Sequence, residues 1–257
     1  MLTTLLLPDS GAAVVDNFDI VQDYKRIRSN IGYMPGKFSL YQDLTVEENL
    51  NFFATLFGTS VAKNYHLIKD IYAQIEPFKN RRAGKLSGGM KQKLALSCAL
   101  IHKPTVLFLD EPTTGVDPVS RKEFWEMLKK LKQQGITILV STPYMDEATL
   151  CDRIALIQEG KLLAIDTPQH VIEQYPEKLY RIRADRMPIL LSHLRLFPKT
   201  LSCFTFGEYL HLSLKEHAAA TLPELHQYLR EKEHTGVEMD PVIPTIEDCF
   251  IRLLRTA

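Results

Sequence analysis

The sequence lacks the features that mark several classes of protein. Its 257 residues carry 31 basic and 31 acidic side chains, so the formal net charge is zero, which gives no electrostatic footprint for nucleic acid or anionic lipid. Four widely spaced cysteines form no C-x-x-C pair, which argues against a disulfide framework or a zinc site. No apolar run approaches the roughly 20 residues needed to cross a bilayer. These absences indicate a globular protein with reduced thiols and without a nucleic-acid partner.

The most informative segment that is present runs from Leu86 to Pro118. Near its start, Ser87, Gly88 and Gly89 precede an apolar pattern of helical period. The first amides of a helix have no partner within it, and the helix dipole favours negative charge there. The segment therefore predicts an anion site at the start of this helix, suited to phosphate.

The second half of the segment predicts a short buried strand with acidic residues at its end. Val106 to Leu109 are apolar, and Asp110 and Glu111 follow directly. A carboxylate at the end of such a strand suits Mg²⁺, and the next one suits a base. This pairing, followed by Asp117 before Pro118, points to phosphoryl transfer to water.

Together these motifs resemble the nucleotide-binding subunit of ABC transporters. LSGGMKQK resembles the family signature, VLFLDEP its Walker B strand with the glutamate, and TGVDP its D-loop. The resemblance implies a P-loop NTPase-like α/β fold with a mostly parallel sheet, and ATP and Mg²⁺ as cofactors. It assigns ATP contacts to Ser87, Gly88, Gly89, Asp110 and Asp117, the metal to Asp110, and the catalytic role to Glu111.

The same resemblance implies partners. In the family two nucleotide-binding domains pack head to tail, so each ATP lies between one subunit's phosphate loop and the other's signature. A separate transmembrane permease carries the substrate. We therefore expect a homo- or heterodimer that lies in the cytoplasm on the inner face of the cell membrane, attached through a permease.

Three departures from the family pattern leave enzyme activity open. No G-x-x-x-x-G-K-[ST] phosphate loop occurs in the sequence. Gly36 stands where the family has a glutamine, and Pro143 where it has a histidine that contacts the γ-phosphate. Met1 to Leu7 are predicted to be the last turns of the helix that follows the missing loop. The sequence favours a late or interrupted reading frame over a naturally loop-free subunit, and leaves both open.

Sequence patterns also predict the organisation of the chain. The prediction is a nucleotide-binding domain over residues 1–168, with a helical subdomain at about 38–104, and a small α+β accessory domain over 169–257. Thr45 and Glu48 form a capping-box pattern at a helix start. By resemblance, Phe38, Leu40, Tyr41 and Leu44 would meet the permease; the alternative is that they staple this helix.

Strands are expected at residues 12–20, 29–34 and 136–141, and a hairpin around Glu159-Gly160. With the order β-α-β-β-α after residue 168, the chain resembles the ATP-binding subunit of an ABC exporter. The alternative is a non-catalytic regulatory partner that supplies its signature to another ATPase subunit.

Overall fold

The structure, a computed structural model, describes residues 1–36, 40–215 and 218–256, and the chain divides into two compact units, Met1–Pro143 and Tyr144–Ala257. Each unit has its own buried clusters. The predicted division into residues 1–168 and 169–257, with a helical subdomain at about 38–104, stays a prediction.

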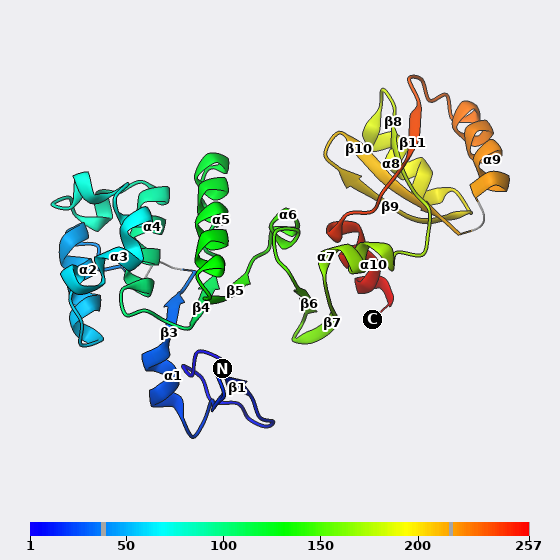
Figure 1. Ribbon diagram of the computed structural model, residues 1–257. Helices are drawn as coiled ribbons and strands as arrows, with labels where there is room; N and C mark the ends of the chain where they lie inside the picture. The colour runs from blue at the N-terminus through cyan, green and yellow to red at the C-terminus, as the bar shows by residue number, and fades with distance from the viewer. Residues whose placement is uncertain (37–39, 216–217, 257) are drawn as a thin grey trace. The chain divides into compact units, whose positions relative to one another are not determined.

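A parallel sheet lies at the centre of the first unit. Strands β3 (Ile31–Met34), β4 (Val106–Asp110) and β5 (Thr137–Ser141) pair in the order β3-β4-β5 (Figure 1). The middle strand is apolar on both faces because each face is covered. Helix α5 (Pro118–Gln133) connects β4 to β5. This arrangement confirms the predicted α/β class with a parallel sheet.

Three helices of this unit share one core with the sheet. They are α2 (Val46–Leu56), α3 (Val61–Tyr72) and α4 (Gly88–Leu100). Two 3-10 turns, Glu76–Phe78 and Ala83–Lys85, join α3 to α4.

The predicted capping box at the start of α2 is confirmed. Thr45 Oγ1 accepts from the amide of Glu48 at 3.2 Å, and the Thr45 amide donates to Glu48 Oε2 at 2.8 Å. Of the residues expected near a permease, Phe38 lies outside the described residues, and Leu40 is buried in the core. Tyr41 is exposed, with its ring against Phe52, so the contact with a permease stays a prediction.

The segment expected to form one strand at residues 12–20 forms a small hairpin instead. Strands β1 (Val14–Val15) and β2 (Phe18–Asp19) pair antiparallel. Between them Asp16 and Asn17 have φ of 52° and 65°, and two successive left-handed residues make a tight turn. The prediction was wrong because it ignored this turn.

Two further differences lie nearby. Helix α1 (Tyr24–Asn30) was not predicted, so the strand expected to begin at Ser29 begins at Ile31. Met1 to Leu7 form turns and no regular helix. Thr4 has a φ of 59° and accepts hydrogen bonds from Arg28 on Oγ1 and on its carbonyl oxygen. These tertiary contacts hold the segment in a conformation that helical periodicity does not predict.

The second unit opens with a hairpin and short helices. Helix α6 (Met145–Ala148) precedes β6 (Ile154–Gln158) and β7 (Lys161–Asp166), and α7 (Pro168–Glu173) follows. The hairpin turns at Glu159-Gly160 as predicted, both residues having positive φ. Residues of these elements form one buried cluster with helix α10 (Ile246–Thr256).

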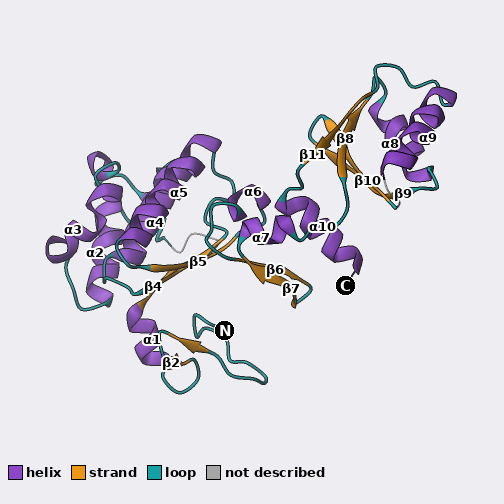
Figure 2. Cartoon of the chain, turned by 45° about the vertical axis from the view of Figure 1, so that its right-hand side comes forward, coloured by secondary structure: helices purple, strands orange, loops and turns teal. Residues whose placement is uncertain are grey.

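The rest of the second unit is an antiparallel sheet with two helices on one face (Figure 2). Its elements in chain order are β8 (Leu179–Arg183), α8 (Met187–Leu196), β9 (Thr200–Phe206), β10 (Tyr209–Leu214), α9 (Ala218–Glu231) and β11 (Glu238–Val242). The strands pair in the order β11-β8-β10-β9. The predicted β-α-β-β-α order is confirmed and extended by β11 into the β-α-β-β-α-β arrangement of ferredoxin-like folds.

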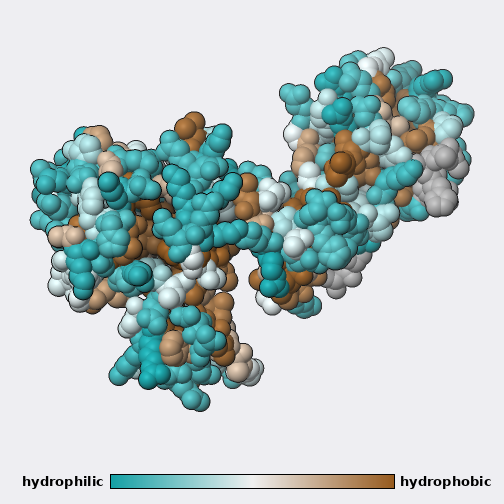
Figure 3. Space-filling view, viewed as in Figure 1, coloured by the Kyte–Doolittle hydropathy of each residue, from teal (hydrophilic) through white to brown (hydrophobic). Residues whose placement is uncertain are grey.

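Apolar side chains also reach the surface. Leu5, Leu6 and Leu7 are 59%, 68% and 74% exposed, and Figure 3 shows hydrophobic atoms on the surface where the N-terminal segment lies in Figure 1. Contiguous exposed apolar side chains mark surfaces that contact other segments or chains. Among the described residues, no helix combines the length and apolar character needed to cross a membrane.

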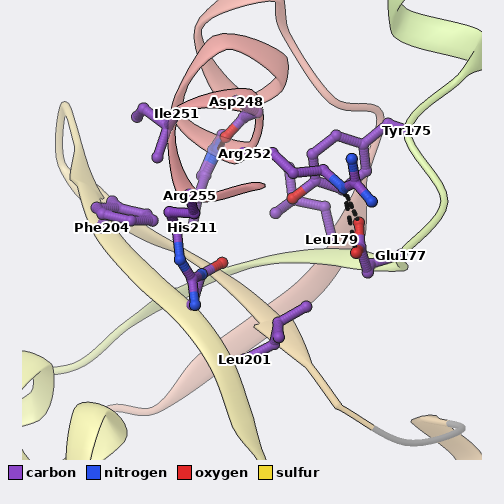
Figure 4. Close-up of a pocket in the computed structure, with 11 residues that line it drawn as sticks. Tyr175, Glu177, Leu179, Leu201, Phe204, His211, Asp248, Ile251, Arg252 and Arg255 are labelled. Carbon is purple, nitrogen blue, oxygen red and sulfur yellow. Dashed lines mark hydrogen bonds and ion pairs between the residues drawn. The ribbon is translucent and has the colours of Figure 1, made fainter. Parts of the chain in front are cut away.

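A buried pair of His211 and Asp248 anchors α10 to the sheet of the second unit (Figure 4). His211 Nδ1 on β10 lies 2.7 Å from Asp248 Oδ1, and both side chains are buried. Thr245 donates to Asp248 Oδ2 from its amide and hydroxyl. Burial opposes ionisation of Asp248, but these hydrogen bonds outweigh it and hold the pKa of its carboxyl below the usual value.

Asp248→Asn is expected to lower the free energy of unfolding by about 1.5–3 kcal/mol near neutral pH, the net contribution of a hydrogen bond to a charged group. The folded-state pKa of Asp248 is lowered, so the ionised form stabilises the fold above the unfolded-state pKa, and this stabilisation is lost as the pH falls below about 4. Urea titrations followed by circular dichroism should show the difference from the unsubstituted protein shrinking in that range.

Asp240→Asn is the matched control, because Asp240 pairs with Arg181 on the exposed face of the sheet. It should change stability by no more than about 1 kcal/mol. A destabilisation by Asp248→Asn that stays constant from neutral pH to well below pH 4 would contradict the assignment.

Candidate nucleotide site

Helix α4 begins where the sequence predicts it. Ser87 is the N-cap, and its Oγ accepts from the amide of Met90 at 3.3 Å. Gly88 and Gly89 form the first turn, which carries no acidic side chain. No acidic side chain of this turn therefore offsets the unpaired amides and the positive end of the helix dipole, as an anion site requires.

The first turn of α4 lies directly against the segment that leads into α5. A Cβ at Gly89 would lie 2.7 Å from Ser120 Oγ and 3.1 Å from Ser120 Cβ, so any larger residue here would force Ser120 to shift. At Gly88 a Cβ would meet the carbonyl oxygen of Gly115 at 3.6 Å, an ordinary distance. The structure thus brings the signature residues beside the TGVDP segment.

Two polar contacts extend this attachment along α4. Gln92 is buried and donates from Nε2 to the carbonyl oxygen of Pro112. The next residue of the helix is Lys93, whose Nζ lies 2.8 Å from Oε2 of Glu123 on α5. Because Pro112 follows Glu111, the position of α4 is tied to the carboxylate end of β4 as well as to α5.

Asp117 acts as the N-cap of α5. Its Oδ1 accepts from the amides of Ser120 and Val119 at 3.0 Å and 3.1 Å. Hydrogen bonds from Ser120 are the main cause that lowers the pKa of Asp117, which keeps the carboxylate ionised. Its predicted contact with ATP stays a prediction beside this structural role.

Asp110 and Glu111 lie at the carboxyl end of β4 as expected. Ser141, paired in register with Asp110, donates its hydroxyl to Asp110 Oδ1. The amide of Glu111 donates to the carbonyl oxygen of Ser141 at 3.0 Å, and Glu111 Oε2 accepts from Thr114 Oγ1 at 3.1 Å. Glu111 has a φ of 44°, a left-handed conformation that turns the chain sharply away from the strand.

Ser141 is the residue of this group that sequence reasoning missed. Its signal was present, because adjacent parallel strands end at one edge of a sheet, so the last residues of β4 and β5 become neighbours. Burial, and then the negative charge of Asp110, raise the pKa of Tyr33 on β3. All three strands therefore contribute to the surroundings of Asp110.

Gly36 lies against Asp110, as its position in the family pattern implies. A Cβ at this position would lie 3.2 Å from the carbonyl oxygen of Asp110 and 3.7 Å from Oδ2. Gly36 itself therefore supplies no side-chain donor beside Asp110. Pro143 follows β5 and Thr142 at the end of the first unit.

The oxygen atoms of Asp110 and Glu111 suit a hard cation. Both residues are exposed, and hydroxyl groups of Thr114 and Ser141 donate to the two carboxylates. Such a donor set fits Mg²⁺. Within the described residues no hydrogen bond joins Ser87 to Asp110 or Glu111.

Comparison with known proteins identifies the family. The ABC transporter family model matches residues 1–114. The Nod factor export ATP-binding protein I of Burkholderia lata is 37% identical over 98% of this chain and 82% of its own length. The chain belongs to the ABC transporter ATP-binding family. This assignment confirms the sequence-based resemblance and the P-loop NTPase-like fold class.

One further relative and one solved structure are also similar to this ABC protein. The "Probable multidrug ABC transporter ATP-binding protein YbhF" of Escherichia coli K12 is 38% identical over all of this chain, which spans only 44% of YbhF. The ATP-binding cassette MJ0796, solved as a post-hydrolysis dimer with ADP and Pi, has a TM-score of 0.57 and 25% identity, covering 64% of this chain and 76% of that one. ATP binding is thus a property of the family.

Gly89→Ala is expected to destabilise the protein by about 1–3 kcal/mol, because the added methyl overlaps Ser120 and forces α4 from α5. Urea unfolding followed by Trp125 fluorescence measures this, since Trp125 lies on α5. The double variant with Ser120→Gly should recover at least part of the loss.

Gly88→Ala is the matched control in the same turn. Its methyl meets only an ordinary contact, and alanine is the better helix former, so stability should stay the same or rise. Equal destabilisation by the two substitutions would show that the close approach of Gly89 to Ser120 does not limit the packing.

Proposed function

We propose that this chain is the ATP-binding part of an export-type ABC transporter that couples ATP binding and hydrolysis to transport through a separate permease. The similarity to the Nod factor export ATP-binding protein I of Burkholderia lata supports the direction of transport. One observation supports the mechanism above all others. The amide end of α4 and the Asp110–Glu111 pair lie in one unit, where contacts of α4 with Pro112 and with α5 connect them, and no hydrogen bond joins Ser87 to either carboxylate among the described residues.

This arrangement suits a site shared between two nucleotide-binding domains. Ser87, Gly88 and Gly89 would bind the phosphates of an ATP held by a second domain through hydroxyl and backbone N–H groups. Asp110 and Glu111 would serve the nucleotide on the chain's own side. The MJ0796 neighbour is described as a dimer, which supports a homo- or heterodimer here.

Each carboxylate has a distinct proposed role. Glu111, turned away from the strand and hydrogen-bonded by Thr114, orients the attacking water and accepts its proton. Asp110, oriented by Ser141, would hold Mg²⁺ through its carboxylate. When bound, Mg²⁺ neutralises charge on the phosphates and lowers the barrier to phosphoryl transfer.

The proposed complex lies on the cytoplasmic face of the membrane through its permease, with no nucleic-acid partner. The zero formal net charge supports the second point. Within the sequence no G-x-x-x-x-G-K-[ST] motif occurs, and Gly36 supplies no side chain of its own beside Asp110. ATP hydrolysis is therefore best measured on the protein expressed from its native gene and purified together with the subunits that accompany it.

Glu111→Gln is expected to lower ATP-dependent phosphate release by that complex by about 10²–10⁴-fold, the typical contribution of a general base. ATP binding should persist, because glutamine keeps the shape of the side chain. Phosphate release and binding of a fluorescent ATP analogue, measured on the same preparations, separate the two effects.

Glu126→Gln is the control, since it makes the same chemical change on an exposed residue of α5. It should leave phosphate release unchanged. If the Glu111 variant and the unsubstituted complex release phosphate equally fast, Glu111 is not the base. If the purified complex contains no second nucleotide-binding domain, the ATP site is not shared.

A further inference from the structure

One hydroxyl group contacts both residues of the candidate carboxylate pair. Ser141 ends β5 and pairs in register with Asp110, which ends the neighbouring strand β4 (Figure 1). Its Oγ donates to Asp110 Oδ1 and accepts from the amide of Glu111 at 3.2 Å. The same amide also donates to the carbonyl oxygen of Ser141 at 3.0 Å. A single side chain of β5 therefore connects the proposed metal ligand to the proposed base.

The contact with Ser141 leaves one oxygen of Asp110 for a ligand. Oδ1 accepts from the hydroxyl of Ser141, whereas no described residue donates to Oδ2. Gly36 lies near Oδ2, since a Cβ at this glycine would be 3.7 Å from it. The last torsion of an aspartate side chain has broad preferences, so without the hydroxyl the carboxylate can turn and exchange its two oxygens. Ser141 therefore determines which oxygen of Asp110 is available to a cation.

The same serine holds the sharp turn at Glu111. This residue has a φ of 44°, a left-handed conformation that a residue with a side chain keeps only where the surrounding structure enforces it. The carbonyl oxygen and Oγ of Ser141 both accept from the Glu111 amide. The orientation of the base therefore depends on the strand that also orients Asp110.

The stability of the fold depends little on this hydroxyl. Ser141 and Asp110 are both exposed, so water can satisfy either group, and the net gain from their hydrogen bond is small. Groups that hydrogen-bond a metal ligand from behind act differently, because their removal typically lowers metal affinity or activity by about 10–100-fold. Metal binding and protein stability can thus be measured separately to find which of the two the hydroxyl supports.

We propose that Ser141 is a positioning residue of the nucleotide site. Its hydroxyl holds Asp110 with Oδ2 available to the divalent cation and keeps Glu111 in a fixed relation to that carboxylate. This inference rests on the proposed function, because Ser141 acts only through Asp110 and Glu111. Loss of the hydroxyl weakens binding of the cation and leaves the contacts of the protein with the nucleotide itself unchanged.

Ser141→Val and Ser141→Thr test this role, because valine and threonine have the same shape and only threonine keeps a hydroxyl. Mn²⁺, which takes the same oxygen ligands as Mg²⁺, is bound to the complex expressed from the native gene, with a non-hydrolysable ATP analogue, and measured by equilibrium dialysis. Ser141→Val should weaken Mn²⁺ binding by about 10–100-fold and raise the Mg²⁺ concentration that half-saturates phosphate release by a similar factor. Ser141→Thr should restore both values.

Two further measurements distinguish positioning from a structural role. In EDTA, where no cation is present, both variants should bind a fluorescent ATP analogue as tightly as the unsubstituted complex. Their urea unfolding midpoints should also be unchanged. Thr137→Val is the matched control, because it removes a hydroxyl from the exposed first residue of the same strand, and it should leave Mn²⁺ binding unchanged.

The outcomes separate this inference from the proposed function. Equal Mn²⁺ affinity in Ser141→Val and the unsubstituted complex, an equal loss in Ser141→Thr, or no Mn²⁺ binding by the unsubstituted complex would each overturn the role of Ser141. The proposed function is tested independently by the loss of phosphate release in Glu111→Gln. If that loss occurs while Ser141→Val binds Mn²⁺ normally, the proposed function stands and only the role of Ser141 is rejected.

Discussion

The close approach of α4 to its neighbours is the constraint on which the first unit depends. At Gly32 of β3, a Cβ would lie 2.5 Å from the carbonyl oxygen of Ala99 on α4, and at Gly89 it would overlap Ser120 of α5. Two positions without a side chain thus let one helix contact the sheet on one side and a neighbouring helix on the other. Overpacked contacts are costly in dense interiors, so these glycines fix where α4 can lie.

The position of α4 in turn decides where the chemistry can occur. Its N-terminus carries the signature residues, and Gln92 and Lys93 bind the segment after Glu111 and the side of α5. Gln92 and Lys93 therefore connect the carboxyl end of β4 and helix α5 to the helix that begins with the signature. Such connections suit the proposed shared ATP site, because each domain must present both groups in a fixed relation.

Much of the fold was predictable because the deciding residues are neighbours in the sequence. The Thr45–Glu48 capping box, the Glu159-Gly160 turn and the Ser87 helix start are each fixed by a few adjacent residues. The hydrogen bond between Asp110 and Ser141 was not predictable in this way, because it depends on the register of two strands separated by a helix. Met1 to Leu7 were mispredicted for a similar reason, since Arg28 holds Thr4 from a distant helix.

The candidate carboxylates were predicted from type and order alone, whereas their partners required the folded chain. Glu111 owes its orientation to a positive φ and to Thr114, and neither follows from the apolar run before it. The same holds for the second unit, where His211 and Asp248 meet only because α10 returns to the second face of the sheet. A sheet with two faces must cover both. Helices α8 and α9 cover one face, and α10 packs against the other, where the buried pair of His211 and Asp248 fixes its place.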